Sequence, residues 1–209
     1  PWTNRAQRLF DESHLPGAEE KIQLYLKGKE LLTAAGYADI GMDHFALPHE
    51  ALYKAWKEGK LHRNFMGYTT QHTGLLLGLG VSSISDAGAA FAQNDKSLSN
   101  YYSAMHEGNL AIRKGYILNE EDQVFRQYIL DITCKGKTTF QTKDLSLIQK
   151  YSFDKLIALA ADGLVEWDAK GMRLTSQGHY FLRNICSVFD LHLARREAVE
   201  EKPLFSKAI

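Results

Sequence analysis

The sequence predicts a mixed α/β fold in two parts, and three observations lead to it. A helical pattern followed by a strand pattern occurs twice within residues 16–85, which is typical of βα units and a parallel sheet. Residues 75–85 form an apolar run without polar alternation, as in strands covered on both faces. After Gly115 the predicted order is helix, helix, hairpin, helix, which is winged-helix-like.

The first part begins with a predicted loop over residues 1–14 and a helix that Pro16 introduces and Gly36 ends. A short strand at 37–45 and a helix at 48–59 follow. Asp43 and His44 stand at the end of that strand. Two interpretations remain open for them: ligand contact at the edge of the sheet, or a turn-stabilising Asp beside a packed His.

Residues 62–85 are the strongest candidate for a ligand site, because polar side chains there precede the apolar run. The polar residues that could grip a ligand are His62, Arg63, Asn64, Tyr68, Thr69, Thr70 and Gln71. We predict a buried strand at 75–85, where Gly78 and Gly80 allow close backbone approach. A ligand site at the end of this strand is one interpretation, and a core strand after a solvated loop is the other.

Beyond this strand the predicted elements alternate between loops and helices. They are a loop at 86–94, helices at 97–113, 120–134 and 154–161, a hairpin of 164–168 with 172–175, a long helix at 176–196 and an extended tail at 197–209.

Composition narrows the possible functions. The chain has 209 residues, of which 44% are hydrophobic, so it can build a core. Its 25 basic and 25 acidic residues cancel, which gives no electrostatic reason to bind nucleic acid or an anionic membrane. The apolar run from Leu75 to Val81 is far shorter than the roughly 20 residues that span a bilayer. Cys134 and Cys186 suit buried, reduced thiols, so we expect a soluble, cytoplasmic protein.

Two further types of site are considered and disfavoured. A winged helix suggests DNA binding, but the helix at 153–161 carries a single cation, Lys155, where a recognition helix needs several donors. A metal site would need clustered ligands, and we predict none because the spacing of the candidate histidines matches no compact motif: His44, His49, His62 and His72.

Several short motifs occur in one order along the chain. They are GMDHFALP at 41–48, LHRNF at 61–65, GYTTQ at 67–71, GLGVSSIS at 78–85, YY at 101–102, DGLV at 162–165 and RNIC at 183–186. In this order they resemble the oxygen-independent coproporphyrinogen III oxidases, also called coproporphyrinogen dehydrogenases, of the radical SAM family. The resemblance implies that residues 1–114 are the C-terminal part of a radical-SAM βα barrel. It implies that residues 115–209 are a mainly helical, winged-helix-like domain that caps the substrate.

The resemblance also implies an activity. Such enzymes convert two propionates of coproporphyrinogen III to vinyl groups, giving protoporphyrinogen IX, with S-adenosylmethionine and a [4Fe–4S] cluster. The cysteine motif that holds the cluster in the family has no counterpart in this sequence. We therefore expect a C-terminal portion that is inactive alone, and a monomer.

Two residues are assigned to S-adenosylmethionine by the resemblance, Ile84 and Met66. Met66 occupies a position where some members have a glutamine that contacts a second S-adenosylmethionine, so the loss of the amide puts that second site in doubt. For the substrate, the seven polar residues from His62 to Gln71 suit propionate carboxylates, and Arg63 can bind one in a bidentate manner. No catalytic residue is assigned.

Two alternatives stay open. A haem-binding or haem-handling relative would share the barrel and the C-terminal domain, and a winged-helix interaction module would have no enzymatic activity. The HRNF, GYTTQ and RNIC motifs favour the oxidase.

Overall fold

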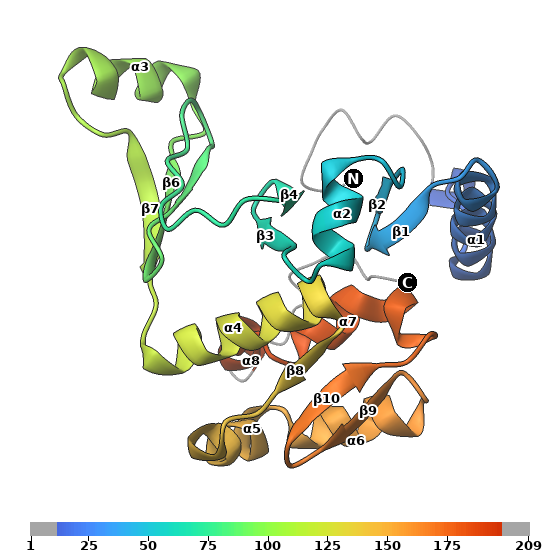
Figure 1. Ribbon diagram of the computed structural model, residues 1–209. Coiled ribbons are helices and arrows are strands. Elements are labelled where there is room, and N and C mark those ends of the chain that lie inside the picture. The colour runs from blue at the N-terminus through green and yellow to red at the C-terminus, as the bar shows by residue number, and fades with distance from the viewer. Residues whose placement is uncertain (1–11, 198–209) are drawn as a thin grey trace.

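The computed structural model describes residues 12–197 of the chain, and its elements form three regions (Figure 1). The predicted tail at 198–209 and most of the predicted loop at 1–14 lie outside the described residues. None of the helices between residues 12 and 197 is both long enough and apolar enough to cross a membrane.

The first region contains two helices and two hairpins. Its elements are α1 (Ala18–Ala34), β1 (Ala38–Gly41), β2 (His44–Ala46), α2 (Ala51–Lys57), β3 (His62–Asn64) and β4 (Gly67–Thr69). β1 pairs with β2 and β3 pairs with β4, both antiparallel. The connections are too short for a parallel crossover, which needs a dozen or more residues. The prediction of a parallel sheet is therefore wrong for the described residues, where every strand pair is antiparallel.

The predicted buried strand at 75–85 is a loop over most of its length. Only Ile84 and Ser85 enter a strand, β5 (Ile84–Asp86), and the side chains of Leu77 and Leu79 are 66% and 87% exposed. Gly80 and Ser82 have φ angles of +93° and +58°, which no strand accommodates. The close approach predicted at Gly78 is present, because a Cβ there would lie 2.7 Å from the Ile84 carbonyl oxygen.

The second region, which we call the arm, projects away from the rest of the molecule (Figure 1). It consists of β5, β6 (Ala90–Asn94) and β7 (Ile112–Ile117) in one antiparallel sheet, with α3 (Leu98–His106) at its tip. The helix predicted to reach residue 113 ends seven residues earlier because Gly108 turns the chain at a φ of +73°. The predicted loop at 86–94 is largely the strand β6.

The third region follows the predicted order of helices and hairpin. Its elements are α4 (Glu120–Lys135), β8 (Lys137–Thr139), a 3-10 turn (Thr142–Asp144), α5 (Leu145–Tyr151), α6 (Phe153–Ala161), β9 (Val165–Asp168), β10 (Gly171–Leu174), a 3-10 turn (Gly178–Phe181), α7 (Leu182–Ser187) and α8 (Leu191–Glu197). β8 joins the predicted hairpin as a third strand, and the predicted long helix at 176–196 is broken into three pieces.

Two buried clusters hold the molecule together. The larger one lies in the third region, around Phe125, Ile132, Leu156 and Phe189. The smaller one lies in the first region and includes Cys134 of α4, which joins the two regions. β7 runs across residue 114, where we predicted a domain boundary, and that boundary stays a prediction.

Candidate functional site

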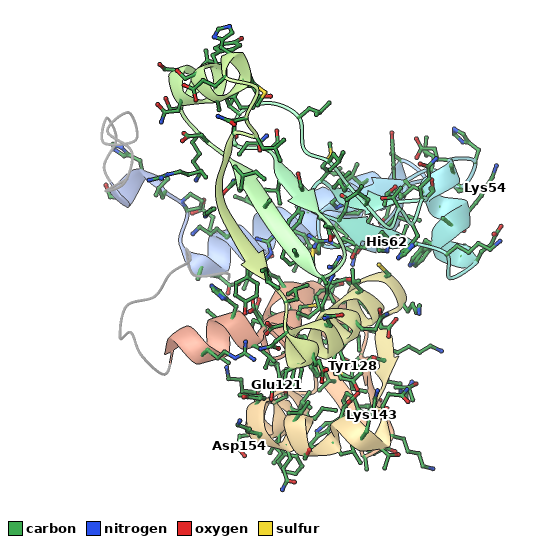
Figure 2. The ribbon with its side chains drawn as sticks, turned by 90° about the vertical axis from the view of Figure 1, so that its left-hand side faces the viewer. Lys54, His62, Glu121, Tyr128, Lys143 and Asp154 are labelled. Carbon is green, nitrogen blue, oxygen red and sulfur yellow. The ribbon has the colours of Figure 1, made fainter. Side chains whose placement is uncertain are left out.

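A cavity of about 870 Å³ lies where the three regions meet. Small-molecule sites occupy roughly 300–1,000 Å³, so this one suits a large ligand. Its lining comes from the β3–β4 hairpin, the arm, α4, the turn before α8 and the start of α8. It consists of Arg63, Asn64, Phe65, Ile84, Asp86, Phe91, Ala92, Gln93, Lys114, Gly115, Tyr116, Leu118, Asp122, Phe125, Arg126, Ile129, Leu130, Phe189, Asp190, Leu191 and His192. In Figure 2, His62 of the hairpin lies on the arm side of α4, opposite Lys143 and Asp154.

The apolar part of the lining is aromatic. The rings of Phe65 and Phe91 meet edge to face with their centroids 5.0 Å apart, which joins the hairpin to the arm. The Arg126 guanidinium lies 4.9 Å from the centroid of Phe91. A flat, apolar ligand core would find aromatic partners here.

Arg126 also fixes one of the carboxylates in the cavity. Its guanidinium donates to the Asp86 carboxylate at 2.5 Å and to the carbonyl oxygen of Gly88 at 2.5 Å. Asp86 accepts a further hydrogen bond from the Gly88 amide at 2.9 Å. Both charges are therefore paired, and the bond clamps the arm to α4.

Arg63 differs from Arg126 in having no such partner. Its Nε atom is buried without a hydrogen bond, and within the described residues the guanidinium makes no ion pair. The guanidinium carbon lies 5.8 Å from the centroid of the Tyr68 ring. Leaving a buried donor unpaired is costly, so this side chain is poised for an acceptor that a ligand could bring.

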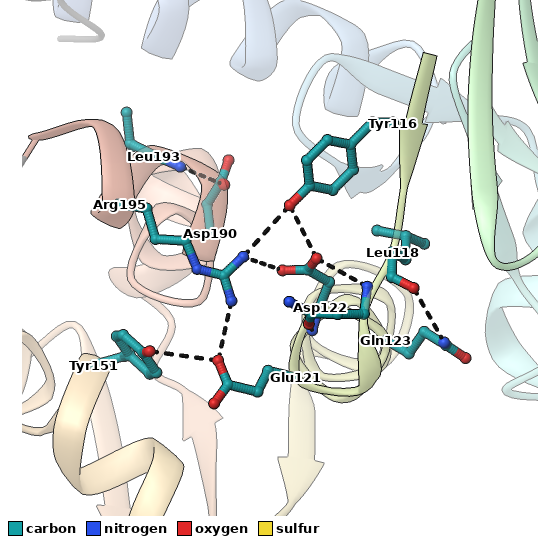
Figure 3. Close-up of polar contacts among 10 residues, drawn as sticks. Tyr116, Leu118, Glu121, Asp122, Gln123, Tyr151, Asp190, Leu193 and Arg195 are labelled. Atoms are coloured by element: carbon teal, nitrogen blue, oxygen red, sulfur yellow. Dashed lines mark hydrogen bonds and ion pairs between the residues drawn. The ribbon is translucent and has the colours of Figure 1, made fainter.

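A network of polar contacts includes two residues of the cavity lining, Tyr116 and Asp122 (Figure 3). Arg195 of α8 donates to Asp122 at 2.6 Å and to Glu121 at 3.0 Å. The Tyr116 hydroxyl donates to the other oxygen of Asp122 at 2.9 Å. Tyr151 donates to Glu121 at 3.3 Å.

The charge of Asp122 is stabilised by this network. Burial alone would raise the pKa of its carboxyl group, but hydrogen bonds from the Asn119 amide, Tyr116 and Arg195 outweigh burial and hold the pKa below its usual value. Asp122 is also part of the capping box that begins α4. Asp122 is thus ionised, and both of its carboxylate oxygens accept hydrogen bonds within the protein.

Three of the predicted ligand residues line the cavity, namely Arg63, Asn64 and Ile84. Asn64 uses its side-chain oxygen to accept from the Met66 amide at 2.9 Å, within the hairpin turn. The others that we predicted do not line it: His62, Met66, Tyr68, Thr69, Thr70 and Gln71. Met66, expected to contact S-adenosylmethionine, is 88% exposed at the tip of the turn.

Tyr68 and His62 are engaged elsewhere. The Tyr68 hydroxyl donates to the Thr133 carbonyl of α4 at 2.8 Å, and burial raises its pKa. His62 packs against the ring of His72 with centroids 4.4 Å apart, and burial, His72 and Arg126 lower its pKa. Thr69 accepts from the Gln71 amide at 3.2 Å.

His44 is a packed residue, which is one of the two interpretations that the sequence left open. Its ring meets Tyr68 edge to face at 5.0 Å, and a Cβ at Gly67 would lie 2.5 Å from its Nε2 atom. Gly67 has a φ of +127°, so this hairpin needs glycine for two reasons.

The chain does not suit an iron–sulfur cluster. Both of its cysteines are buried, and burial raises the pKa of Cys134 and raises that of Cys186 to about 12. Cluster ligands are thiolates, whereas these are neutral thiols. No group of three or more His, Cys, Asp or Glu side chains suited to a metal ion occurs within residues 12–197.

Much of the cavity was missed by sequence reasoning. Phe91 lies in a predicted loop, Arg126 and His192 lie in predicted helices, and Lys114 and Tyr116 lie between two predicted helices. None of these residues lies in a recognisable motif of its own segment, and only the tertiary fold brings them together.

Comparison with known proteins finds relatives that share one name. No protein-family model matches it. The oxygen-independent coproporphyrinogen III oxidase of Escherichia coli is 40% identical over 98% of the chain and 45% of its own length. The enzymes of the same name from Synechocystis and Thermostichus vulcanus are 37% and 35% identical, over 100% and 97% of the chain and 46% and 63% of their own lengths.

A solved structure gives the same result. Coproporphyrinogen III oxidase from Escherichia coli, described as a radical SAM enzyme, superposes with a TM-score of 0.79 at 40% identity and covers 90% of this chain and 45% of its own. The chain thus spans about half the length of most of the curated relatives it matches. The resemblance predicted from the motifs is confirmed: over nearly its whole length, this chain is homologous in sequence and fold to one part of the oxygen-independent coproporphyrinogen III oxidases.

Proposed function

We propose that this chain is part of an oxygen-independent coproporphyrinogen III oxidase and contributes to binding its substrate. The observation that carries the proposal is the 40% identity to the Escherichia coli oxidase over 98% of the chain. The cavity supports it, because an aromatic surface with an unpaired guanidinium suits an apolar macrocycle that carries carboxylates.

The proposed reaction converts two propionates of coproporphyrinogen III to vinyl groups. Each propionate loses one hydrogen atom, one molecule of carbon dioxide and one electron, and the electron passes to an acceptor. S-adenosylmethionine and a [4Fe–4S] cluster would supply the radical that removes the hydrogen atom. The buried cysteines of this chain do not suit the cluster, so we assign this chain to substrate binding and to shielding.

Arg63 is the residue best placed to anchor a propionate. A carboxylate can accept two parallel hydrogen bonds from the Arg63 guanidinium. Such a pair neutralises the charge of the carboxylate and also fixes its orientation. Phe65, Ile84 and Phe91 would cover the macrocycle and exclude water from a reactive carbon. We keep Ile84 as the proposed contact to S-adenosylmethionine. The exposed Met66 has no donor for a second molecule, and a second contact there is not proposed.

A haem-handling function is the second candidate, and one residue favours it. His192 is exposed and lines the same cavity, and an imidazole can ligate haem iron. We also propose that the protein acts as a monomer, which sedimentation velocity would check.

One experiment separates the two candidates. The protein that carries this chain is reconstituted anaerobically with iron, sulfide and S-adenosylmethionine, given coproporphyrinogen III and an electron acceptor, and its products are separated by chromatography. The oxidase is expected to yield a product with two vinyl groups and two remaining carboxylates. A stable Soret band on adding haem, lost in His192→Ala, with no loss of carbon dioxide from coproporphyrinogen III, would instead establish haem handling.

A further inference from the structure

A second unpaired cation, Lys114, lines the cavity. Lys114 lies in β7, paired in register with Gln93 of β6, and is exposed. Among the residues that the structure describes, its ammonium group makes no ion pair and no hydrogen bond. It comes from the arm, whereas Arg63 comes from the β3–β4 hairpin.

The other charged groups in the lining are already neutralised or engaged. Arg126 is bonded to Asp86, and Asp122 is bonded to Arg195. Asp190 accepts from the amide of Leu193 at 2.9 Å at the start of α8. Arg63 and Lys114 therefore remain as the two cations whose charge is available to a ligand.

We propose that Arg63 and Lys114 each bind a different carboxylate of one ligand, so that the cavity selects macrocycles with at least two carboxylates. This inference rests on the proposed function. The substrate would enter with four carboxylates and leave with two, so a site with two anchors can hold the substrate, the half-reacted species and the product in turn. Arg126 does not serve as an anchor, because its charge is taken by Asp86.

The chain offers a matched control next to Lys114. Arg113 precedes it on β7, where the register shifts so that Gln93 pairs with Lys114 and Asn94 with Ile112, and Arg113 is the extra residue between them. Arg113 does not line the cavity, so Arg113→Met removes the same charge from the same strand without touching the site. Both side chains are exposed, so neither substitution threatens the fold.

The test is a fluorescence titration of the protein at low salt with two porphyrins. One is coproporphyrin III, a stable tetracarboxylate, and the other is its tetraamide, which has the same shape without charge. Lys114→Met is expected to weaken binding of coproporphyrin III about tenfold and Arg63→Met by more, whereas Arg113→Met stays within about twofold. The double variant Arg63→Met/Lys114→Met is expected to show the product of the single effects. None of these substitutions should change the affinity for the tetraamide.

Three results would overturn the inference. If Lys114→Met matches Arg113→Met while Arg63→Met is weakened, the cavity has one anchor and the proposed function still stands. If the double variant is no weaker than Arg63→Met alone, both cations share one carboxylate. If the unsubstituted protein binds neither porphyrin, the two-anchor site and the proposed substrate fail together.

Discussion

The guanidinium of Arg195 in α8 lies 2.6 Å from the carboxylate of Asp122 in the first turn of α4. The same guanidinium lies 3.0 Å from Glu121. Because Leu191 and His192 of α8 line the cavity, this contact fixes one of its walls. A residue in the last described helix thereby sets the shape of a site formed by segments far away in sequence.

Removing Arg195 is expected to destabilise the protein. Asp122 is 6% exposed and would lose a charged donor, so Arg195→Met should lower the free energy of unfolding by about 2 kcal/mol. Arg173 is the matched control, since its pair with Glu166 is largely exposed and Arg173→Met should cost less than about 0.5 kcal/mol. Urea denaturation of both variants measures the difference, and equal losses would contradict the role of Arg195.

The stability of the protein should depend on pH through Asp122. Its pKa is lower in the folded state than the value of about 3.9 in an unfolded chain. Its contribution is therefore complete well above pH 4 and is lost as the pH falls through the folded-state pKa. Urea midpoints between pH 6 and pH 2.5 should fall less steeply in Asp122→Asn than in the unsubstituted protein. Parallel curves for the two proteins would show that Asp122 does not contribute.

Tyr68 is expected to act in stability rather than in ligand binding. Its hydroxyl satisfies the Thr133 carbonyl, so Tyr68→Phe should cost about 1–2 kcal/mol of unfolding free energy and leave the affinity for coproporphyrin III unchanged. Tyr53→Phe serves as control, because no hydrogen bond of the Tyr53 hydroxyl occurs in the described structure. If Tyr68→Phe instead binds porphyrin more weakly with unchanged stability, Tyr68 contacts the substrate.

The Arg126–Asp86 clamp should show strong coupling. Arg126→Met leaves a carboxylate that is 15% exposed without its partner, which should cost about 2–3 kcal/mol. Asp86→Asn in the same molecule should recover part of that loss, since the uncompensated charge is then gone. A double-mutant cycle by urea denaturation gives the coupling energy, and a value near zero would mean that the arm is held by other contacts.

Local signals predicted part of this fold. The helix at 120–134 and the hairpin of 164–168 with 172–175 were predicted close to their observed bounds, because both are fixed by local contacts. Asn119 and Asp122 form the capping box of α4, and Asp168 accepts from the Lys170 amide in the hairpin turn. The loop at 75–83 was mistaken for a strand since its conformation depends on distant partners. Asn94 donates to the carbonyls of Gly78 and Gly80, and Tyr101 accepts from the Gly80 amide.

The candidate site was predictable only in part, for a related reason. Arg63 and Asn64 were predicted because polar side chains cluster before the apolar run, and Ile84 was predicted because its motif resembles a known family. Lys114, Arg126 and His192 reach the cavity from a strand and two helices, and nothing in their own segments distinguishes them from surface residues. The hairpin register alone does not decide which polar residues reach the cavity, because Arg63 and Tyr68 are paired and share a face, yet only Arg63 lines the cavity.

The central claim is that Arg63 anchors a carboxylate of the substrate, and turnover of Arg63 variants tests it most directly. In the reconstituted protein, Arg63→Met is expected to lower kcat/KM for coproporphyrinogen III by about 100-fold, which corresponds to about 2.7 kcal/mol. Arg63→Lys should recover part of this, because the charge remains while the bidentate geometry is lost. An unchanged kcat/KM in Arg63→Met, with the fold intact by circular dichroism, would contradict the account.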